Sequence, residues 1–365
     1  MTFEEFEKEW FNEEPEVIAH TSGSTGKPKQ IRLRKEAMRR SAWRTMHALY
    51  GNFFDRERDR KEYRLTERPL SRFHSCVAAD YIGGKMMAVR AWEADALFSA
   101  ETPSNYPLSG FSSTDRIDLL SVVPSQLENI IDRMSQGEAL PSIGDILVGG
   151  APLPHSLKER IGRMKLPEGL RIWETYGMTE TCSHIALRAV KSPDTNGAFS
   201  TSSSSGLFVP LPGIKLSLDE RECLIIEIDG ERVVTNDIVA LSGNGFTVIG
   251  RYDNAIITGG LKVLPEMGER LLAPLLNQYG IMTFALTSRP HHKWGEELLL
   301  AIPENEKSDY RAESLLNDLK KHLAVQYIPK AILSVTELPY LPNGKIDRCL
   351  LRAIASTFPS KERDL

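Results

Sequence analysis

The sequence contains little cysteine. Four cysteines occur in 365 residues, and they lie far apart, at Cys76, Cys182, Cys223 and Cys349. Their separations match none of the short spacings that structural zinc sites use. Such a sparse set is typical of reduced core or loop thiols, so we expect a cytoplasmic protein.

Long apolar runs and an excess of positive charge are also missing. No run approaches the ~18 apolar residues of a transmembrane helix, and residues 1–16 are too acidic for a signal peptide. The 49 acidic and 45 basic side chains give a net charge of −4, which predicts neither a nucleic-acid partner nor membrane insertion. The sequence has no convincing Ser-His-Asp or Cys-His set, so no nucleophilic side chain is expected.

The most unusual stretch lies near the N-terminus and consists mainly of Ser, Thr and Gly. It reads Thr21-Ser22-Gly23-Ser24-Thr25-Gly26-Lys27-Pro28-Lys29. Glycines let a backbone approach a ligand, and hydroxyls, N–H groups and lysines suit phosphate oxygens. It is not a Walker A loop, because Pro28 follows Lys27 and residues 30–34 alternate like a strand. A flexible Ser/Gly hairpin loop is the alternative interpretation.

The rest of the chain has the pattern of an α/β protein. Residues 35–50 have helical spacing, and the apolar runs 119–123 and 146–148 each end in a turn followed by a helical pattern. Repeated strand, turn and helix predict largely parallel strands, with ligands bound beyond their carboxyl ends. The turn Gly149-Gly150-Ala151 would lie there. Residues 209–216 and 223–228 predict strands of a small β subdomain.

Two of these stretches resemble one family. Residues 21–29 are similar to the phosphate-binding signature of the acyl-adenylate-forming superfamily, which contains acyl-CoA synthetases, adenylation domains and luciferases. Residues 176–181, Tyr-Gly-Met-Thr-Glu-Thr, resemble its second core motif almost letter for letter. The resemblance implies that Tyr176 and Gly177 face adenine, Thr179 bonds the α-phosphate and Glu180 binds Mg²⁺. The alternative interpretation of this segment, which ignores the resemblance, is a strand edge and turn with incidental polar residues.

Further motifs fit the same resemblance. Gly149, Gly150 and Ala151 would line the adenine. Residues 235–237 resemble the family's Thr-Gly-Asp, with Asp237 on the ribose, and residues 250–253 resemble the domain boundary, with Arg251 on ribose or phosphate and Asp253 as the hinge. Residues 341–348 resemble the C-terminal motif that presents the catalytic lysine, here Lys345. Residues 265–269 keep one acid of the family's Pro-x-Glu-x-Glu and receive no role.

The resemblance implies an α/β fold in two domains. We expect a large N-terminal AMP-binding domain, residues 1–251, with mixed or parallel sheets and a small β subdomain. A smaller, mobile α+β domain, residues 252–365, would carry Lys345. Only about twenty residues precede the phosphate loop, so most of the family's usual N-terminal subdomain is expected to be missing.

The implied reaction joins an acid to a thiol. The carboxylate attacks the α-phosphate of ATP, pyrophosphate leaves, and CoA then takes the acyl group, with Mg²⁺ as the metal. Residues 177–188, 81–90 and 208–226 look most like the o-succinylbenzoate–CoA ligases of menaquinone biosynthesis. Their substrate has two carboxylates, so Lys85 is expected to bind one, with Ser183 and His184 near the aromatic ring.

Two alternatives stay open. One is another aryl- or acyl-CoA ligase, or an enzyme that loads a carrier-protein thiol. The other is a nucleotide-binding protein without turnover, against which the intact Lys345 and Glu180 argue. The expected partners are small molecules, namely the acid, ATP and CoA, and a homodimer is left open.

Overall fold

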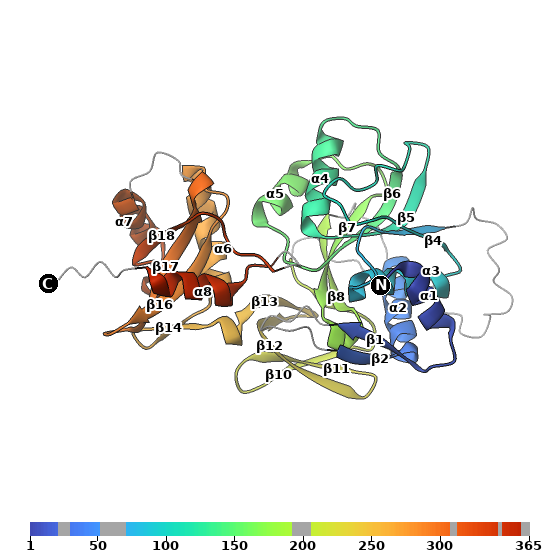
Figure 1. The fold of residues 1–365 in the computed structure, drawn as a ribbon, viewed down its shortest axis with the longest axis horizontal. Coiled ribbons are helices and arrows are strands. Elements are labelled where there is room, and N and C mark those ends of the chain that lie inside the picture. The colour runs from blue at the N-terminus through green and yellow to red at the C-terminus, as the bar shows by residue number, and fades with distance from the viewer. Residues whose placement is uncertain (21–29, 52–70, 192–205, 307–311, 342–344, 359–365) are drawn as a thin grey trace. The chain divides into compact units, whose positions relative to one another are not determined.

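The computed structural model describes residues 1–20, 30–51, 71–191, 206–306, 312–341 and 345–358 (Figure 1). Its largest sheet has seven strands in the order β4-β3-β5-β6-β7-β8-β9. The first five strands are parallel, and β8 and β9 are antiparallel to their neighbours. Their bounds are β3 (Arg72–Ser75), β4 (Leu97–Ala100), β5 (Arg116–Val122), β6 (Ser142–Val148), β7 (Arg171–Gly177), β8 (His184–Lys191) and β9 (Val209–Pro210).

Helices cover both faces of this sheet. On one face, α4 (Pro124–Ser135) and α5 (His155–Arg163) pack apolar side chains such as Leu127 and Ile161 against the strands. On the other face, α2 (Lys35–Tyr50) and α3 (Ile82–Glu93) contribute Met46 and Met87 to a second core. Two covered faces explain why the last four residues of β5 and of β6 are all buried instead of alternating between buried and exposed.

The N-terminal segment packs beside α2 and α3. Helix α1 (Phe3–Phe11) begins with a capping box, in which Thr2 and Glu5 each accept a backbone hydrogen bond from the other. Its Phe6 and Trp10 are buried with residues of β1 (Glu16–His20) and β2 (Gln30–Arg34). These two strands are antiparallel, and His20 pairs with Gln30. The predicted strand after the phosphate loop is therefore confirmed, whereas the loop itself lies outside the described residues.

A four-stranded sheet follows in the order β10-β11-β12-β13. Its strands are β10 (Lys215–Leu218), β11 (Cys223–Ile228), β12 (Glu231–Ser242) and β13 (Gly245–Arg251). The predicted strand at 209–216 is wrong in one respect, because the chain turns between β9 and β10. Gly213 has a φ of +75°, a conformation that a strand does not contain.

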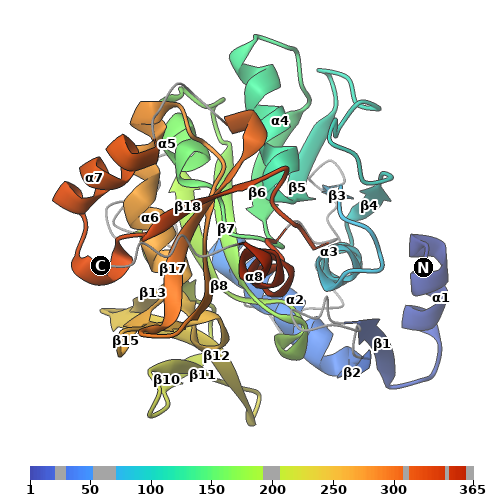
Figure 2. The same ribbon diagram turned by 60° about the vertical axis from the view of Figure 1, so that its left-hand side comes forward.

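The C-terminal part contains a five-stranded sheet with helices on both faces (Figure 2). Along β17, Leu298, Leu300 and Ile302 pack with α6 and α7, whereas Leu299 and Ala301 pack with α8. The period of two assigns alternate residues to opposite faces. The elements are β14 (Ile256–Thr258), β15 (Leu261–Val263), α6 (Pro265–Leu276), β16 (Ala285–His291), β17 (Gly295–Pro303), α7 (Ala312–His322), β18 (Ala331–Val335), α8 (Arg348–Thr357), and the short helices η2 (Thr179–Thr181), η3 (Tyr252–Asn254), η4 (Asn277–Tyr279), η5 (Glu304–Glu306) and η6 (Val325–Tyr327).

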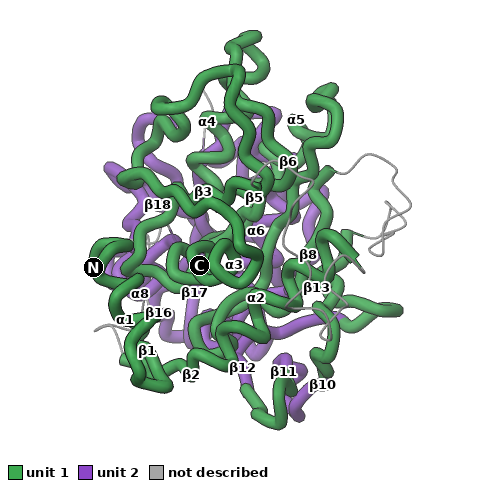
Figure 3. The backbone as a smooth tube through the Cα atoms, turned by 90° about the vertical axis from the view of Figure 1, so that its right-hand side faces the viewer, with its two compact units in different colours: residues 1–216, 226–233, 241–247 green, residues 217–225, 234–240, 248–365 purple. Residues whose placement is uncertain are grey.

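The chain divides into two compact units (Figure 3). Unit 1 contains residues 1–216, 226–233 and 241–247, and unit 2 contains residues 217–225, 234–240 and 248–365. The predicted boundary after residue 251 stays a prediction. The α/β fold with parallel and mixed sheets is confirmed. Among the described residues, no helix combines the length and apolar character needed to cross a membrane.

Gly84, in the first turn of α3, lies against the preceding backbone. A Cβ there would be 2.2 Å from the carbonyl oxygen of Ala78, whereas one on Gly83 would meet only a side-chain methyl, at 3.8 Å. Gly84→Ala should therefore destabilise the protein by about 1–3 kcal/mol through overpacking. Gly83→Ala, the matched control, should be neutral or stabilise by up to about 1 kcal/mol through helix propensity. Urea unfolding measures both, and equal effects of the two changes would contradict this packing.

Candidate active site

The second core motif lies in the tight turn between β7 and β8 of unit 1. Gly177 pairs with His184 across this turn. A Cβ on Gly177 would be 2.3 Å from both the His184 Cα and the Ser183 carbonyl oxygen. Only glycine permits this approach, so the predicted role of Gly177, a close backbone contact, applies to its own chain as well as to a ligand.

Thr181 holds this turn together. Its hydroxyl group donates to the Ser183 carbonyl oxygen at 2.7 Å. The oxygen of the same hydroxyl group accepts a hydrogen bond from the Met178 N–H at 3.2 Å. The turn includes Cys182 at a φ of +62°, a conformation that non-glycine residues rarely adopt. Thr179 is buried, whereas Glu180 is exposed. The turn therefore presents one carboxylate to solvent beside a buried hydroxyl group.

The Glu180 carboxylate fits a magnesium ligand. It has no hydrogen bond or ion pair to another described residue in the structure, so its oxygens are available. Mg²⁺ prefers such hard carboxylate oxygens and usually keeps several waters.

Tyr176 is supported by two aromatic rings that sequence reasoning missed. Its ring centroid lies 5.6 Å from that of Phe208 and 5.0 Å from that of Phe246. Gly149 and Gly150 follow β6, and a Cβ on Gly149 would be 2.7 Å from Thr175 Oγ1. The glycine turn thus directly follows β6, and Tyr176 lies at the end of β7, the neighbouring parallel strand. Both lie at the carboxyl ends of the strands, where the sequence predicted them.

Ser183 and His184 belong to a buried network with an arginine that was not predicted. Arg90 on α3 donates from Nη2 to Ser183 Oγ at 2.8 Å and lies 3.4 Å from His184 Nδ1. His184 Nε2 is 2.9 Å from Thr45 Oγ1, whose hydroxyl group donates to the Ser41 carbonyl oxygen. Burial and the charge of Arg90 hold the pKa of His184 well below its usual value. His184 is therefore neutral, with its proton on Nε2.

Lys85 lies elsewhere, under the N-terminal segment. Its side chain is buried, with Nζ 2.6 Å from Met1 Sδ and 4.4 Å from the centre of the Phe6 ring. Burial lowers the pKa of Lys85, although Glu9 and Asp80 oppose this effect. The predicted contact between Lys85 and a substrate carboxylate stays a prediction.

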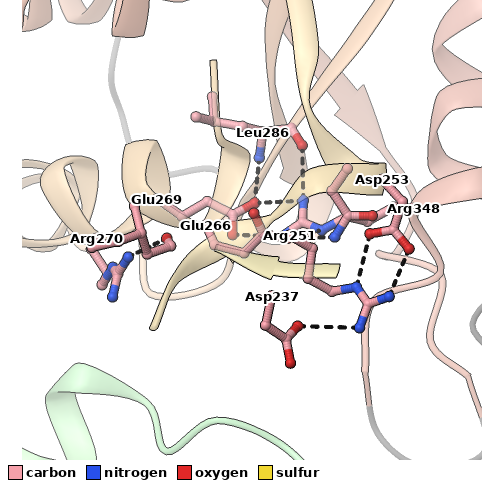
Figure 4. Close-up of polar contacts among 10 residues, drawn as sticks. Asp237, Arg251, Asp253, Glu266, Glu269, Arg270, Leu286 and Arg348 are labelled. Atoms are coloured by element: carbon pink, nitrogen blue, oxygen red, sulfur yellow. Dashed lines mark hydrogen bonds and ion pairs between the residues drawn. The ribbon is translucent and has the colours of Figure 1, made fainter. Parts of the chain in front are cut away.

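In unit 2, Arg251 bridges two predicted site residues (Figure 4). It donates to both carboxylate oxygens of Asp253, at 2.9 and 2.6 Å, and from Nη1 to Asp237 at 3.3 Å. Burial would raise the pKa of Asp253, but the hydrogen bonds and charge of Arg251 lower it. The predicted ribose, phosphate and hinge residues therefore form one charged cluster.

Lys345 belongs to the same cluster. The side chain as a whole is exposed, yet neighbouring protein atoms remove water from its ammonium group, which lowers its pKa; Asp237 opposes this effect and Arg251 adds to it. Two backbone hydrogen bonds fix the chain around it, from Leu341 N to the Lys345 carbonyl oxygen and from Asp347 N to the Pro339 carbonyl oxygen. The structure thus brings Lys345 into the surroundings of Asp237 and Arg251.

Glu269, which had no assigned role, forms a bidentate ion pair with Arg348 (Figure 4). The two bonds are 3.0 and 2.8 Å long, and the Leu286 N–H also donates to Glu269, at 2.8 Å. Burial raises the pKa of Glu269, while Arg348 and the Leu286 N–H act in the opposite direction. Arg348 follows Lys345 by three residues, so this ion pair anchors the segment that carries the lysine.

The predicted site residues therefore fall into three groups. Unit 1 contains Gly149, Gly150, Ala151, Tyr176, Gly177, Thr179, Glu180, Ser183, His184 and Lys85, and unit 2 contains Asp237, Arg251, Asp253 and Lys345. The phosphate-loop residues Thr21, Ser22, Gly23, Ser24, Thr25, Gly26 and Lys29 lie outside the described residues.

Several known proteins are similar to this chain in sequence. The indoleacetate–CoA ligase of Aromatoleum aromaticum is 26% identical over 376 residues, which are 94% of this chain and 68% of that enzyme. The 2-succinylbenzoate–CoA ligase of Lactococcus lactis is 28% identical over 255 residues, 65% of this chain and 51% of that enzyme. This second match thus spans about half the length of the relative.

Two solved structures have the same fold. An AMP-forming acyl-CoA synthetase/AMP-acid ligase II-like protein from Dyadobacter fermentans is 32% identical, with a TM-score of 0.55 over 95% of this chain and 91% of that one. The o-succinylbenzoate–CoA synthetase of Bacillus subtilis, in complex with its acyl-adenylate, has a TM-score of 0.69 at 20% identity over 92% of this chain and 68% of that one. At that identity the likeness shows the fold alone.

The fold and the motifs at the carboxyl ends of β6 and β7 define an enzyme that forms acyl-adenylates. The chain belongs to the AMP-binding enzyme family, whose model matches residues 4–241, more than half of the sequence. The predicted class, an ATP-dependent, AMP-forming acid–CoA ligase, is confirmed.

Neutralising Glu269 should slow adenylation. Glu269→Gln removes the bidentate partner of Arg348 and leaves only the 3.4 Å contact with Glu266 Oε1, so the lysine segment loses most of its anchor. We expect adenylation to slow by about 10- to 100-fold, the scale of a small misplacement of a catalytic group. Because the resemblance implies that Lys345 acts in adenylation, CoA transfer from preformed adenylate should be little affected. Glu159→Gln, which removes an exposed surface pair on α5, is the control, and equal losses in both half-reactions would contradict a positioning role.

The lowered pKa of Lys345 predicts a pH limit. The resemblance implies that adenylation needs the charged ammonium group of Lys345. A lowered pKa means that this charge is lost at lower pH than in an ordinary lysine. Adenylation should therefore decline on the alkaline side below the usual lysine range. Lys345→Arg, measured at the activity it retains, should lack that decline. A decline that persists in the arginine variant would assign it to another group.

Proposed function

We propose that this chain adenylates o-succinylbenzoate with ATP and transfers the acyl group to CoA, in menaquinone biosynthesis. The relatives named 2-succinylbenzoate–CoA ligase support this choice of acid. The structural observation that carries it is Arg90, because a buried cation without a carboxylate partner suits a substrate that has a second carboxylate.

Burial makes the Arg90 charge costly. The residue is 2% exposed, and burial lowers its pKa to about 9. Among the described residues, no carboxylate forms an ion pair with it, and its Nε atom has no hydrogen-bond partner. A buried charge is costly unless it is paired. An anionic ligand would supply the missing charge.

The neighbours of Arg90 are neutral. Ser183 and the uncharged His184 accept hydrogen bonds from one edge of the guanidinium group, so they orient it without neutralising it. Ser183 directly precedes β8 and His184 is its first residue. Both follow the turn that contains Thr179 and Glu180. In this proposal Arg90 binds the carboxylate that does not react, and its neighbours connect it to the adenylate motif.

The other residues position and neutralise charge. Lys345 would bridge the reacting carboxylate and the α-phosphate, and Glu180 would hold Mg²⁺, which neutralises phosphate charge when bound. Tyr176 and the turn Gly149-Gly150-Ala151 would face adenine, and Asp237 would hold the ribose hydroxyls. Residues 21–29 would bind the outer phosphates.

Acid, ATP and CoA are the partners in this proposal, and a cytoplasmic location and a homodimer are parts of it. The four cysteines are free, three of them buried, which supports a reducing compartment. The alternatives are a ligase for an acid with one carboxylate, such as the indoleacetate of one relative's name, transfer to a carrier-protein thiol, and binding without turnover.

ATP–pyrophosphate exchange with Mg²⁺ tests the proposal. We expect exchange that depends on o-succinylbenzoate and is lost in Lys345→Ala. Arg90→Gln should raise the KM for this acid by about 10- to 100-fold, the worth of a charge-assisted hydrogen bond. Lys85→Ala, tested in parallel, shows which cation binds the second carboxylate. Exchange with acids that have one carboxylate only would discard this substrate and keep the chemistry.

Two controls make the Arg90 result specific. Arg133 is also a buried arginine, but it pairs with Glu138, so Arg133→Gln should leave the KM for the acid unchanged. Arg90→Met removes an unpaired buried charge, so it should preserve or raise the Tm while it weakens acid binding. A fall in Tm that matches the loss of activity would contradict a substrate-binding role.

A further inference from the structure

A second cluster of reactive side chains lies at the carboxyl ends of β3 and β4 in unit 1. His74 lies in β3, Cys76 follows it, and Glu101 follows β4. One ligand atom from each of these three residues lies within 4.8 Å of the other two. The Glu101 N–H donates to the Ser75 carbonyl oxygen at 3.1 Å, which fixes the two strand ends side by side. No residue of the adenylate site belongs to this cluster.

The His74 ring is oriented with one nitrogen available. Its Nδ1 atom lies 2.9 Å from Ser99 Oγ. Its Nε2 atom is buried without a hydrogen-bond partner and lies 3.6 Å from Glu101 Oε2. When the imidazole donates its Nδ1 proton to Ser99 Oγ, Nε2 presents a lone pair beside the Glu101 carboxylate, and a cation bound between these two groups would suit both.

The other two ligands are also held in place. Both oxygens of Glu101 accept from the Leu108 N–H at 3.1 Å, and Leu108 has a φ of +64°. The Phe111 ring packs edge-on against His74, with centroids 4.7 Å apart. Cys76 is fully buried in the core under the sheet. Ligands that are held by second contacts of this kind are typical of metal sites.

We propose that His74 Nε2, Cys76 Sγ and Glu101 bind Zn²⁺, with a fourth position open to water. Imidazole, thiolate and carboxylate together suit zinc, whereas Mg²⁺ prefers oxygen alone. Cys76 loses its proton to solvent when the metal binds, so binding releases one proton. The Glu101 side chain is 20% exposed, which provides the route of entry. The Ser99 hydroxyl group orients the imidazole from its other nitrogen.

Cobalt(II) titration of the full chain tests this site. One equivalent of Co²⁺ should produce the absorption of a thiolate-to-cobalt charge transfer, and Zn²⁺ should displace it. Cys76→Ser should abolish this absorption. Ser99→Ala should weaken metal binding by about 10-fold, the usual effect of losing such a second contact. Cys223→Ser, which alters a buried cysteine in unit 2, should have no effect.

Folding of the variants is followed separately. Glu101→Gln changes a partly exposed side chain, so it should fold normally and bind Co²⁺ at least about 10-fold more weakly. The proposal is overturned if folded protein gives no thiolate absorption, or if the absorption survives Cys76→Ser. None of these measurements depends on ligase activity, so the result is independent of the proposed acid.

Discussion

The backbone of Gly177 packs directly on the backbone of Ser183 and His184, and this contact determines the geometry around the core motif. Since a Cβ would come within 2.3 Å of two backbone atoms, the β7–β8 turn closes only with glycine there. The closed turn leaves Glu180 exposed, buries Thr179, and brings Ser183 and His184 against Arg90. One steric constraint therefore connects the residues proposed to bind the metal, the phosphate and the acid.

The buried arginines differ in whether a carboxylate of the protein neutralises them. In unit 2, Arg348 has a bidentate carboxylate partner and Arg251 has two acidic partners, so the charges near Lys345 are neutralised by the protein itself. In unit 1, Arg133 is paired with Glu138 in the same way, whereas Arg90 forms hydrogen bonds only to neutral groups among the described residues. Paired charges of the first kind fix the position of a backbone segment, whereas an unpaired charge stabilises the protein only when an anion arrives. This contrast supports a structural role for Arg348, which fixes a backbone segment, and a ligand-binding role for Arg90.

The sequence predicted the parts of the protein whose signal is local. Periodicity identified α2, β5 and β6, and contiguous motifs identified the turns at Gly149 and Gly177 and the segment around Lys345. It missed Arg90, which looked like one more polar residue in a helix, and Phe208 and Phe246, which are far from Tyr176 in the chain. It also missed the partner of Arg348, because Glu269 stands 79 residues away. Contacts between segments that are far apart in the chain produce no characteristic residue spacing, so the sequence alone does not predict them.

The proposed zinc ligands and Arg90 belong to one supersecondary unit. Strand β3, helix α3 and strand β4 form a parallel β-α-β unit. In it, α3 carries Arg90, and Cys76 and Glu101 follow the two strand ends. A metal bound to both ends would close this unit and restrict how far α3 can shift against the sheet. Because no carboxylate in the described part of the chain pairs with Arg90, its position depends on the packing of α3. A zinc ion at the strand ends would therefore stabilise the geometry for acid binding while it leaves the nucleotide residues on β6 and β7 unchanged.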